Sequence, residues 1–343
     1  MRAAVIREHG GPEVIAVVED LAVPTPGAGE VRVRMHAVAL NRLDLWVRKG
    51  WRGLKLAMPH VMCADGAGMV DAVGPDVRDF RPGDRVCIDP TLVPQDDPAL
   101  TPGLENQSRM HILGETVPGL ASEYAVVPAR NLLNMPEDVS AAGAAAAGLV
   151  YLTAWHSLIT RGHLRAGESV LIVGAGGGVN TASIQIAKLA GATVYVVGSS
   201  AEKCALAAAL GADVTFNRAE TPEWSREVYQ WTDKRGVDVV VDNVGQATMT
   251  DSLRAVRIGG RILVVGNTSG PLVEMDLRYL FSKHLSIIGS TMGPHADYLA
   301  VMSLIFEGRL QPVIGARLPL EQASEGIRLL ENFEVFGKVV LEI

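Results

Sequence analysis

Five consecutive small residues in the middle of the chain, Gly174-Ala175-Gly176-Gly177-Gly178, have the composition and the setting needed to bind a phosphate group. An apolar run precedes them, and the apolar positions after them recur with helical spacing. Glycines let the backbone turn tightly and let a pyrophosphate approach the free N–H groups at a helix N-terminus, where the dipole favours an anion. We therefore expect a dinucleotide to contact Gly174, Gly176, Gly177, Gly178 and Val179. A tight turn without a ligand is the alternative.

The residues after the next predicted strand indicate which dinucleotide is bound. A site that prefers NAD has an Asp or Glu near this point to bind the ribose 2′-hydroxyl. This chain instead has Gly198-Ser199-Ser200, with Lys203 close behind. Small hydroxyl residues and a lysine leave room and positive charge for a 2′-phosphate, so we expect NADPH rather than NADH, although Ser200 also suits a helix N-cap. The fingerprint is incomplete at Asn180, where a glycine is usual.

The elements that position these residues alternate between strands and helices from about residue 169. The predicted strands are Ser169–Val173, Thr193–Val197, Val239–Asp242, Arg261–Val265 and Leu285–Gly289. Apolar strands separated by helices predict a parallel sheet covered on both faces, which is an α/β fold with a doubly wound sheet.

The rest of the chain has a different pattern. Residues 1–138 are predicted to be mostly β, with short alternating runs between Pro/Gly turns at Glu30–Met35, Gly68–Val73, Asp84–Ile88 and Ser122–Val127. A long polar segment, about 90–112, interrupts them, and an Ala-rich helix is expected at 141–149. After residue 293 we expect a helix at about 297–307, a strand near 312–314, a helix at about 320–333 and a last strand at 338–343.

Composition excludes several classes of partner. The 343 residues suit two domains, and 48% hydrophobic with 20% charged residues is ordinary for a globular protein. The net charge is −7 and no run of Lys or Arg stands out, so neither nucleic acid nor an anionic membrane is an expected partner. We see no signal peptide, and the apolar stretch 141–150 is too short to cross a bilayer. Three cysteines far apart in sequence argue against a disulfide framework, so a cytoplasmic location is expected.

Along nearly its whole length the chain resembles the medium-chain dehydrogenase/reductase superfamily. The resemblance rests on the order and spacing of short motifs, among them Asn41-Arg42-Leu43-Asp44, Asp65-Gly66-Ala67-Gly68, Phe80-Arg81-Pro82-Gly83-Asp84-Arg85-Val86, Gly211-Ala212-Asp213 and Phe336-Gly337-Lys338-Val339-Val340. It implies a GroES-like β domain built from both chain ends, with predicted bounds 1–138 and 294–343. It also implies a Rossmann domain at 139–293, an active site in a cleft, and a homodimer or homotetramer.

The resemblance also locates the positions that bind zinc in the alcohol dehydrogenases of this superfamily. The three catalytic ligand positions fall at Asn41, at Ala64 beside Asp65, and near Leu149, and none of these is a good zinc ligand. The structural zinc of that branch uses four cysteines in a long loop. The matching register here places Pro94, Asp97, Leu100 and Ser108 at those spacings, so we expect neither zinc.

By resemblance the substrate pocket includes Asn41, Asp44 and Thr153. Asn41 is expected to donate a hydrogen bond to a substrate oxygen, and Asp44 either supports the Asn41 loop or moves protons. Further expected cofactor contacts are Asp242, Gly266 and Asn267 at strand ends, with Lys338 at the pyrophosphate, and for Lys338 a solvated surface lysine is an equal alternative.

The function that these observations favour is NADPH-dependent hydride transfer to a quinone, enone or related conjugated carbonyl, because charge can delocalise as the hydride arrives even without a metal. One alternative is an alcohol dehydrogenase acting on an alcohol/aldehyde pair. Another is a non-catalytic protein that binds the cofactor but has lost its chemistry. The predicted edge strand Leu285–Gly289 is expected to pair with its symmetry mate in a dimer.

Overall fold

The computed structural model describes residues 1–94 and 110–343, which form two compact units. The first unit contains both ends of the chain, Met1–Leu152 and Gly293–Ile343, and the second is Thr153–Met292. The first boundary therefore lies after Leu152 rather than after residue 138. The reason is that helix α2 (Ala141–Trp155) begins among the residues of the first unit. A Cβ atom on its Gly148 would lie 2.2 Å from Asp65 Oδ1, so only glycine permits this approach.

The main sheet of the first unit has the strand order β10-β6-β5-β3-β18-β17, with β9 also paired to β3. Its strands are β3 (Glu30–Leu40), β5 (Asp65–Val73), β6 (Arg85–Ile88), β9 (Tyr124–Pro128), β10 (Leu132–Asn134), β17 (Ile314–Pro319) and β18 (Lys338–Glu342). The last strand runs antiparallel to β3 and pairs Val339 with Leu40. This register brings Lys338 beside Asn41, although almost 300 residues separate them in sequence.

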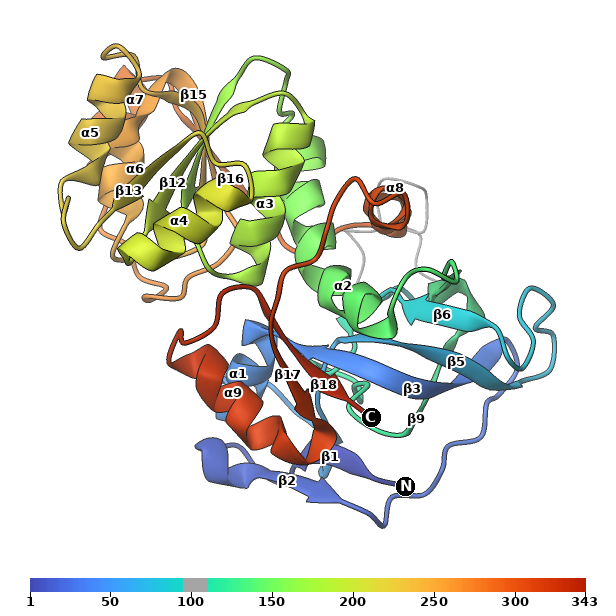
Figure 1. Ribbon diagram of the computed structural model, residues 1–343. Coiled ribbons are helices and arrows are strands. Elements are labelled where there is room, and N and C mark those ends of the chain that lie inside the picture. The colour runs from blue at the N-terminus through green and yellow to red at the C-terminus, as the bar shows by residue number, and fades with distance from the viewer. Residues whose placement is uncertain (95–109) are drawn as a thin grey trace. The chain divides into compact units, whose positions relative to one another are not determined.

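Smaller elements complete the first unit (Figure 1). The strands are β1 (Ala3–Ile6), β2 (Ile15–Val18), β4 (His60–Val61), β7 (Thr91–Leu92) and β8 (His111–Ile112), and the helices are α1 (Arg42–Lys49), α8 (His295–Phe306) and α9 (Ala323–Glu331). Strand β3 shows why the core lies where it does. Its side chains alternate between buried and accessible at first, and from Ala37 to Leu40 all are buried, so this end of the strand is covered on both faces.

The second unit is a parallel sheet with helices on both faces, in the order β13-β12-β11-β14-β15-β16 (Figure 1). Its strands are β11 (Ser169–Val173), β12 (Thr193–Gly198), β13 (Val214–Asn217), β14 (Val237–Asp242), β15 (Val256–Val264) and β16 (Ser286–Gly289). Helices α3 (Gly178–Leu189) and α4 (Ala201–Ala209) cover one face, and α5 (Trp224–Trp231) and α6 (Met249–Ala255) pack on the other. The predicted doubly wound sheet is confirmed, and β13 is the strand that the sequence pattern missed.

The order of these strands locates a binding site in the second unit. The chain moves outward in one direction through β11, β12 and β13 and then in the opposite direction through β14, β15 and β16. In open sheets of this kind, ligands bind outside the carboxyl ends of the strands at the point where the order reverses. That point lies between β11 and β14.

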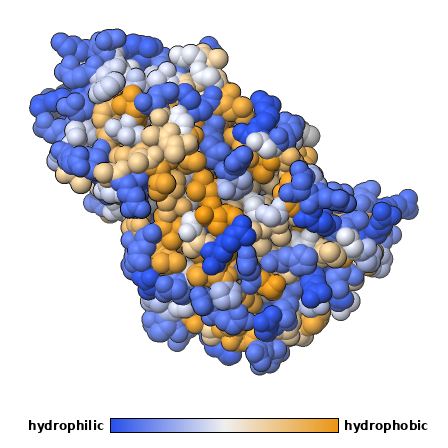
Figure 2. Space-filling model, in the orientation of Figure 1, coloured by the Kyte–Doolittle hydropathy of each residue, from blue (hydrophilic) through white to orange (hydrophobic). Residues whose placement is uncertain are grey.

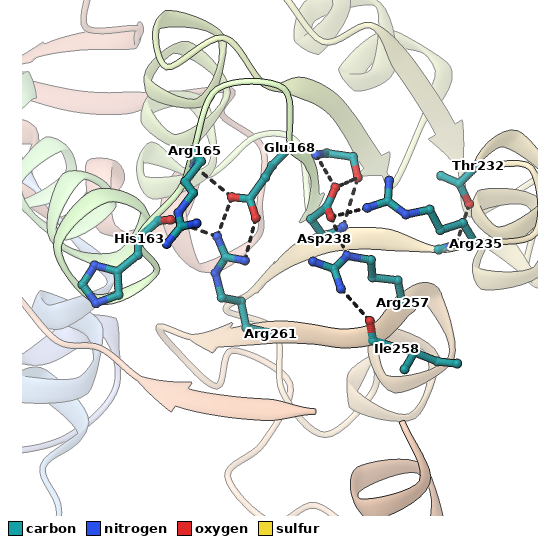
Figure 3. Close-up of polar contacts among 11 residues, drawn as sticks. His163, Arg165, Glu168, Thr232, Arg235, Asp238, Arg257, Ile258 and Arg261 are labelled. Carbon is teal, nitrogen blue, oxygen red and sulfur yellow. Dashed lines mark hydrogen bonds and ion pairs between the residues drawn. The ribbon is translucent and has the colours of Figure 1, made fainter. Parts of the chain in front are cut away.

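Ion pairs join the strands of the same sheet near their amino ends, opposite the carboxyl ends where a ligand is expected (Figure 3). Arg261 forms an ion pair with Glu168 at 2.6 Å. The Asp238 carboxylate accepts a hydrogen bond from Ser169 Oγ at 2.7 Å and forms ion pairs with Arg235 and Arg257. Burial alone would raise the pKa of Asp238, but these hydrogen bonds outweigh it and lower the pKa. Both carboxylates are therefore paired with arginines within the protein.

The surface of the second unit is mostly hydrophilic, with an apolar area over α4 (Figure 2). Alanines and Leu206 occupy most of its exposed positions. Within residues 1–94 and 110–343, one helix, Ala141–Arg161, is long and apolar enough to cross a membrane, which the stretch 141–150 alone is not. Because 78% of its most apolar window is buried within the structure, it has the environment of a core helix.

Candidate functional site

The glycine-rich turn lies between β11 and α3, as its sequence predicts. Gly174 has φ +101°, a conformation that glycine adopts without strain, and its N–H donates to Val197 O of the neighbouring strand at 2.9 Å. Gly177 is the N-cap of α3 and is exposed, and Gly176 and Gly178 beside it are partly accessible. The turn thus presents the N-terminus of a 12-residue helix at the carboxyl edge of the sheet.

Asn180, the departure from the fingerprint, braces this turn. Its Nδ2 donates to Val173 O at 3.0 Å and to Gly174 O at 2.7 Å, and its Oδ1 accepts from Asn243 Nδ2 at 3.0 Å. Asn243 follows β14, so the bond crosses the point where the strand order reverses. Because a trans peptide holds its C=O and N–H in opposite directions, fixing Gly174 O also fixes the direction of the next N–H. The asparagine therefore fits where a glycine is usual and adds three hydrogen bonds.

Hydrogen bonds also hold the loop after β14 in shape and join it to the loop after β15. Asp242 is fully buried, and its carboxylate accepts from the N–H groups of Val244 and Gly245 and from the hydroxyls of Thr248 and Ser252. It therefore holds the loop in shape, which is a supporting role. Gly266 and Asn267 follow β15, and the next residue, Thr268, donates its N–H to Asn243 O at 3.2 Å.

Beside the carboxyl end of β12 lies a basic residue, Arg218, that the sequence pattern did not identify. Ser200 Oγ accepts from Lys203 N–H at 3.2 Å, so Ser200 is the N-cap of α4, and Ser199 is exposed. The unpredicted strand β13 ends beside Gly198, and the exposed Arg218 that follows donates its N–H to Gly198 O at 3.0 Å. Arg218 was missed because no strand was expected at Val214–Asn217.

In the first unit, Asn41, Asp65 and Lys338 form a buried polar cluster. Asn41 Nδ2 donates to Asp65 Oδ2 at 2.8 Å, and Lys338 Nζ donates to Asp65 Oδ2 at 3.1 Å and to Asn41 Oδ1. The other carboxylate oxygen of Asp65 accepts from Leu149 N–H at 2.6 Å. The side chain of Lys338 is only 4% exposed, so the expectation of a solvated surface lysine is wrong.

Asp44 lies in the first turn of α1, whose N-cap is Asn41, and supports this cluster. Its carboxylate accepts the N–H of Asn41 at 2.7 Å and the N–H of Cys63 at 2.9 Å. Burial raises the pKa of Asp44 to about 6, against the opposing effect of these bonds and of the Lys338 charge. Cys63 has φ +71°, unusual for a residue with a Cβ, and the bond that its N–H donates to Asp44 holds it there. Asp44 therefore supports the Asn41 loop.

The three positions that resemble zinc-ligand positions do meet in space, because Asn41 and Leu149 both donate to Asp65, which follows Ala64. Their chemistry does not fit a zinc ion. Across residues 1–94 and 110–343, no three His, Cys, Asp or Glu side chains are grouped to hold a metal. Asp65, the carboxylate that accepts from Asn41 Nδ2, is already paired with the Lys338 ammonium, which repels a divalent cation. Of the other predicted zinc-lobe positions, Asp97, Leu100 and Ser108 lie outside the described residues, and Pro94 precedes them.

The predicted catalytic residues fall in both units. Asn41 and Asp44 lie in the cluster, whereas Thr153 belongs to the second unit, where its hydroxyl donates to Met292 Sδ at 3.9 Å. Lys338 joins the cluster although its sequence context had suggested a pyrophosphate contact. Both N–H groups of the Asn41 amide already donate, to Asp65 and to Ala39 O at 3.3 Å, which favours a supporting role for Asn41 over the expected one.

Comparisons with known proteins agree with the fold. Residues 27–137 match the alcohol dehydrogenase GroES-like domain, and residues 178–307 match the zinc-binding dehydrogenase family. Human quinone oxidoreductase is 30% identical over 99% of this chain and 97% of its own. The chain belongs to the medium-chain dehydrogenase/reductase superfamily. It is accordingly an NAD(P)-dependent oxidoreductase with a GroES-like domain and a Rossmann domain.

Other relatives within this superfamily show a range of activities. The acryloyl-coenzyme A reductase of Metallosphaera sedula is 31% identical over 99% of both chains. The crystal structure of an NAD-dependent alcohol dehydrogenase is 46% identical, with a TM-score of 0.96 and full coverage of both chains. Relatives of this chain within the superfamily therefore differ in the reaction that they catalyse.

Proposed function

We propose that this protein reduces a quinone, enone or related conjugated carbonyl with NADPH and without zinc. The observation that carries the proposal is the ammonium group of Lys338, which pairs with Asp65 beside the positions that resemble zinc ligands. A site that already contains a buried cation and lacks Cys and His ligands is poorly suited to a metal. Conjugated substrates suit such a site because charge spreads over several atoms during the reaction.

The residues of each unit have separate tasks in this proposal. When bound, NADPH supplies a hydride from its nicotinamide ring. The turn at Gly174–Gly178, braced by Asn180, would hold the pyrophosphate at the N-terminus of α3. Gly266 and Asn267, at the carboxyl end of β15, would offer backbone groups to the carboxamide. The cluster around Lys338 would orient the substrate oxygen and keep the surrounding amides fixed.

Alcohol dehydrogenation with NAD is the second candidate, because this chain is 46% identical to an NAD-dependent alcohol dehydrogenase of known structure. A screen of both reactions separates the two: NADPH or NADH oxidation with quinones, enones, enoyl thioesters and aldehydes, and NAD(P) reduction with alcohols. The proposal predicts turnover with a conjugated acceptor and little with simple alcohols. Turnover only of alcohols would favour the second candidate, and no turnover with any compound would favour a non-catalytic cofactor-binding protein.

The preference for NADPH rests on Lys203 and Arg218, the two basic side chains at the corner after β12 and β13. Positions 198–200, where a site that prefers NAD has an Asp or Glu to bind the ribose hydroxyl, contain no carboxylate. We expect Arg218→Ala and Lys203→Ala each to weaken NADPH binding about tenfold, the equivalent of roughly 1.4 kcal/mol, and to leave NADH binding nearly unchanged. Calorimetric titration of each variant with both cofactors measures this. Equal weakening of both cofactors would show that neither residue contacts the 2′-phosphate.

A homodimer or homotetramer and a cytoplasmic location complete the proposal. Strand β16 is an edge strand of its sheet, and three apolar side chains of the segment that precedes it in sequence, Leu272, Leu277 and Phe281, are 79%, 62% and 68% exposed. Pairing of β16 with its symmetry mate would satisfy the edge N–H and C=O groups and cover such side chains. Light scattering at micromolar concentration tests this, and a monomer mass would refute it. All three cysteines are unpaired and buried, which suits a reducing compartment.

A further inference from the structure

We propose that Lys338, rather than Asn41, stabilises the negative charge that forms on the substrate oxygen. The inference rests on the proposed reduction of a conjugated carbonyl and names the residue that replaces a metal in it. Its basis is the set of hydrogen bonds in the buried cluster of Asn41, Asp44, Asp65 and Lys338.

The Lys338 ammonium is the group of this cluster that has an N–H left to donate. The Asn41 amide has two N–H bonds, and they donate to Asp65 Oδ2 and Ala39 O. The carboxylates of Asp44 and Asp65 only accept when ionised. The ammonium group of Lys338 has three N–H bonds, of which two are directed to Asn41 Oδ1 and Asp65 Oδ2. No acceptor within residues 1–94 and 110–343 takes the third, which is therefore the donor that remains for a substrate.

The setting also makes the Lys338 charge effective. Its side chain is 4% exposed and that of Asp65 is fully buried, so little water screens the ammonium group. Asp65 is itself fixed by Leu149 N–H, and Asn41 is fixed by Asp65. A donor that is held in place by its neighbours does not need to reorganise when charge develops on the substrate, which is the main requirement for electrostatic stabilisation.

In the reaction the substrate accepts a hydride at its β-carbon from bound NADPH. The π electrons of the C=C bond then form the C=C bond of an enolate, and the carbonyl π electrons become a lone pair on oxygen, where Lys338 donates a hydrogen bond. A proton from water adds to the α-carbon and restores the carbonyl group, so Lys338 keeps its own protons throughout. The products are the saturated carbonyl compound and NADP⁺.

The test compares Lys338→Met, which keeps the length of the side chain and removes the charge, with Lys188→Met as a control. Lys188 pairs with Asp213 on the surface of the second unit, 36% exposed. We expect Lys338→Met to lower kcat for an enone about 100- to 1,000-fold and to leave the Kd for NADPH within about twofold of the wild-type value. The control Lys188→Met should leave both kcat and Kd within about twofold of wild type. An unchanged kcat would overturn the proposal. A Kd raised tenfold or more, with kcat intact at saturation, would instead assign Lys338 to the pyrophosphate.

A spectroscopic probe covers the case in which Lys338→Met does not fold, and it does not depend on turnover. The probe is 4-nitrophenol, which mimics an enolate and is yellow as the phenolate, added to the wild-type complex with NADP⁺. We expect it to bind as the phenolate at a pH where the free compound is mostly protonated, and we expect Lys338→Gln to abolish that signal. Binding as the neutral phenol, no binding, or an unchanged signal in Lys338→Gln would overturn the role of Lys338. Absence of turnover with every acceptor would instead overturn the proposed reaction.

Discussion

The glycine-rich turn of the second unit and the polar cluster of the first unit are built in contrasting ways. The turn and its helix come from one continuous segment, and Asn243 adds a single bond from the next strand end. The cluster takes side chains or backbone groups from four separate segments, namely 41–44, 63–65, Leu149 and Lys338. A short-range motif can therefore be recognised by its spacing, whereas the cluster exists only because β18 returns to pair with β3.

The two regions also treat charge differently. At the turn the braces are neutral amides and carbonyls, so the helix N-terminus stays available to an anion from outside. In the cluster an ammonium group and a carboxylate are already paired in the interior. We infer that the turn is built to receive charge and the cluster is built to retain it, and the following variants test that distinction.

The largest effect is expected from breaking the cluster. Asp65→Ala would leave the buried Lys338 ammonium without its anion and Leu149 N–H without its acceptor. Removing one partner of a buried ion pair typically costs about 3–5 kcal/mol, so the free energy of unfolding should fall by about that amount. Urea denaturation measures it. Glu325→Ala, which breaks an exposed pair with Arg328 in the same unit, is the control and should cost less than about 1 kcal/mol.

A similar loss for both variants would mean that the charge of Asp65 is screened and that the cluster is not a dry site. A loss above the control would support its isolation from water.

A smaller effect is expected at the turn. Asn180→Ala removes three hydrogen bonds and frees the Gly174 carbonyl to rotate, so we expect NADPH binding to weaken about 10- to 100-fold, equivalent to roughly 1.4–2.8 kcal/mol. Ser183→Ala is a matched control on the same helix, because Ser183 is also buried and its hydroxyl has no hydrogen-bond partner. Titration followed by NADPH fluorescence gives both values. If Asn180→Ala bound NADPH as tightly as Ser183→Ala, the brace would have no part in cofactor binding.

The last effect, no larger than the one at the turn, concerns protonation of Asp44. Its pKa is raised to about 6 in the folded protein, against about 3.9 in an unfolded chain. Between these values the folded state binds more protons, so the Asp44 contribution to the free energy of unfolding decreases as pH rises from about 4 to about 6, by at most roughly 1.4 kcal/mol per pH unit. Urea denaturation of wild type and Asp44→Asn across this range isolates that contribution as their difference. A difference that stays constant with pH would place the Asp44 pKa near its ordinary value.

The sequence predicted the strands of the second unit better than the chemistry of the first. Strand β11 matched its predicted bounds because a buried parallel strand is a continuous apolar run with a clear turn after it. Strand β13 was missed because it is short and only one of its side chains, Phe216, is buried, and Arg218 was missed with it. Lys338 could be recognised as part of a motif, but its partners could not, because pairing between residues 297 positions apart depends on strand register.

The most direct test of the account is the turnover of one preparation, made without a histidine tag, before and after exhaustive treatment with a chelator. The account predicts much less than one zinc per chain and an unchanged rate of NADPH oxidation with a conjugated acceptor, because Lys338 provides the positive charge that the site needs. A rate that is lost on chelation and restored by stoichiometric zinc would contradict it.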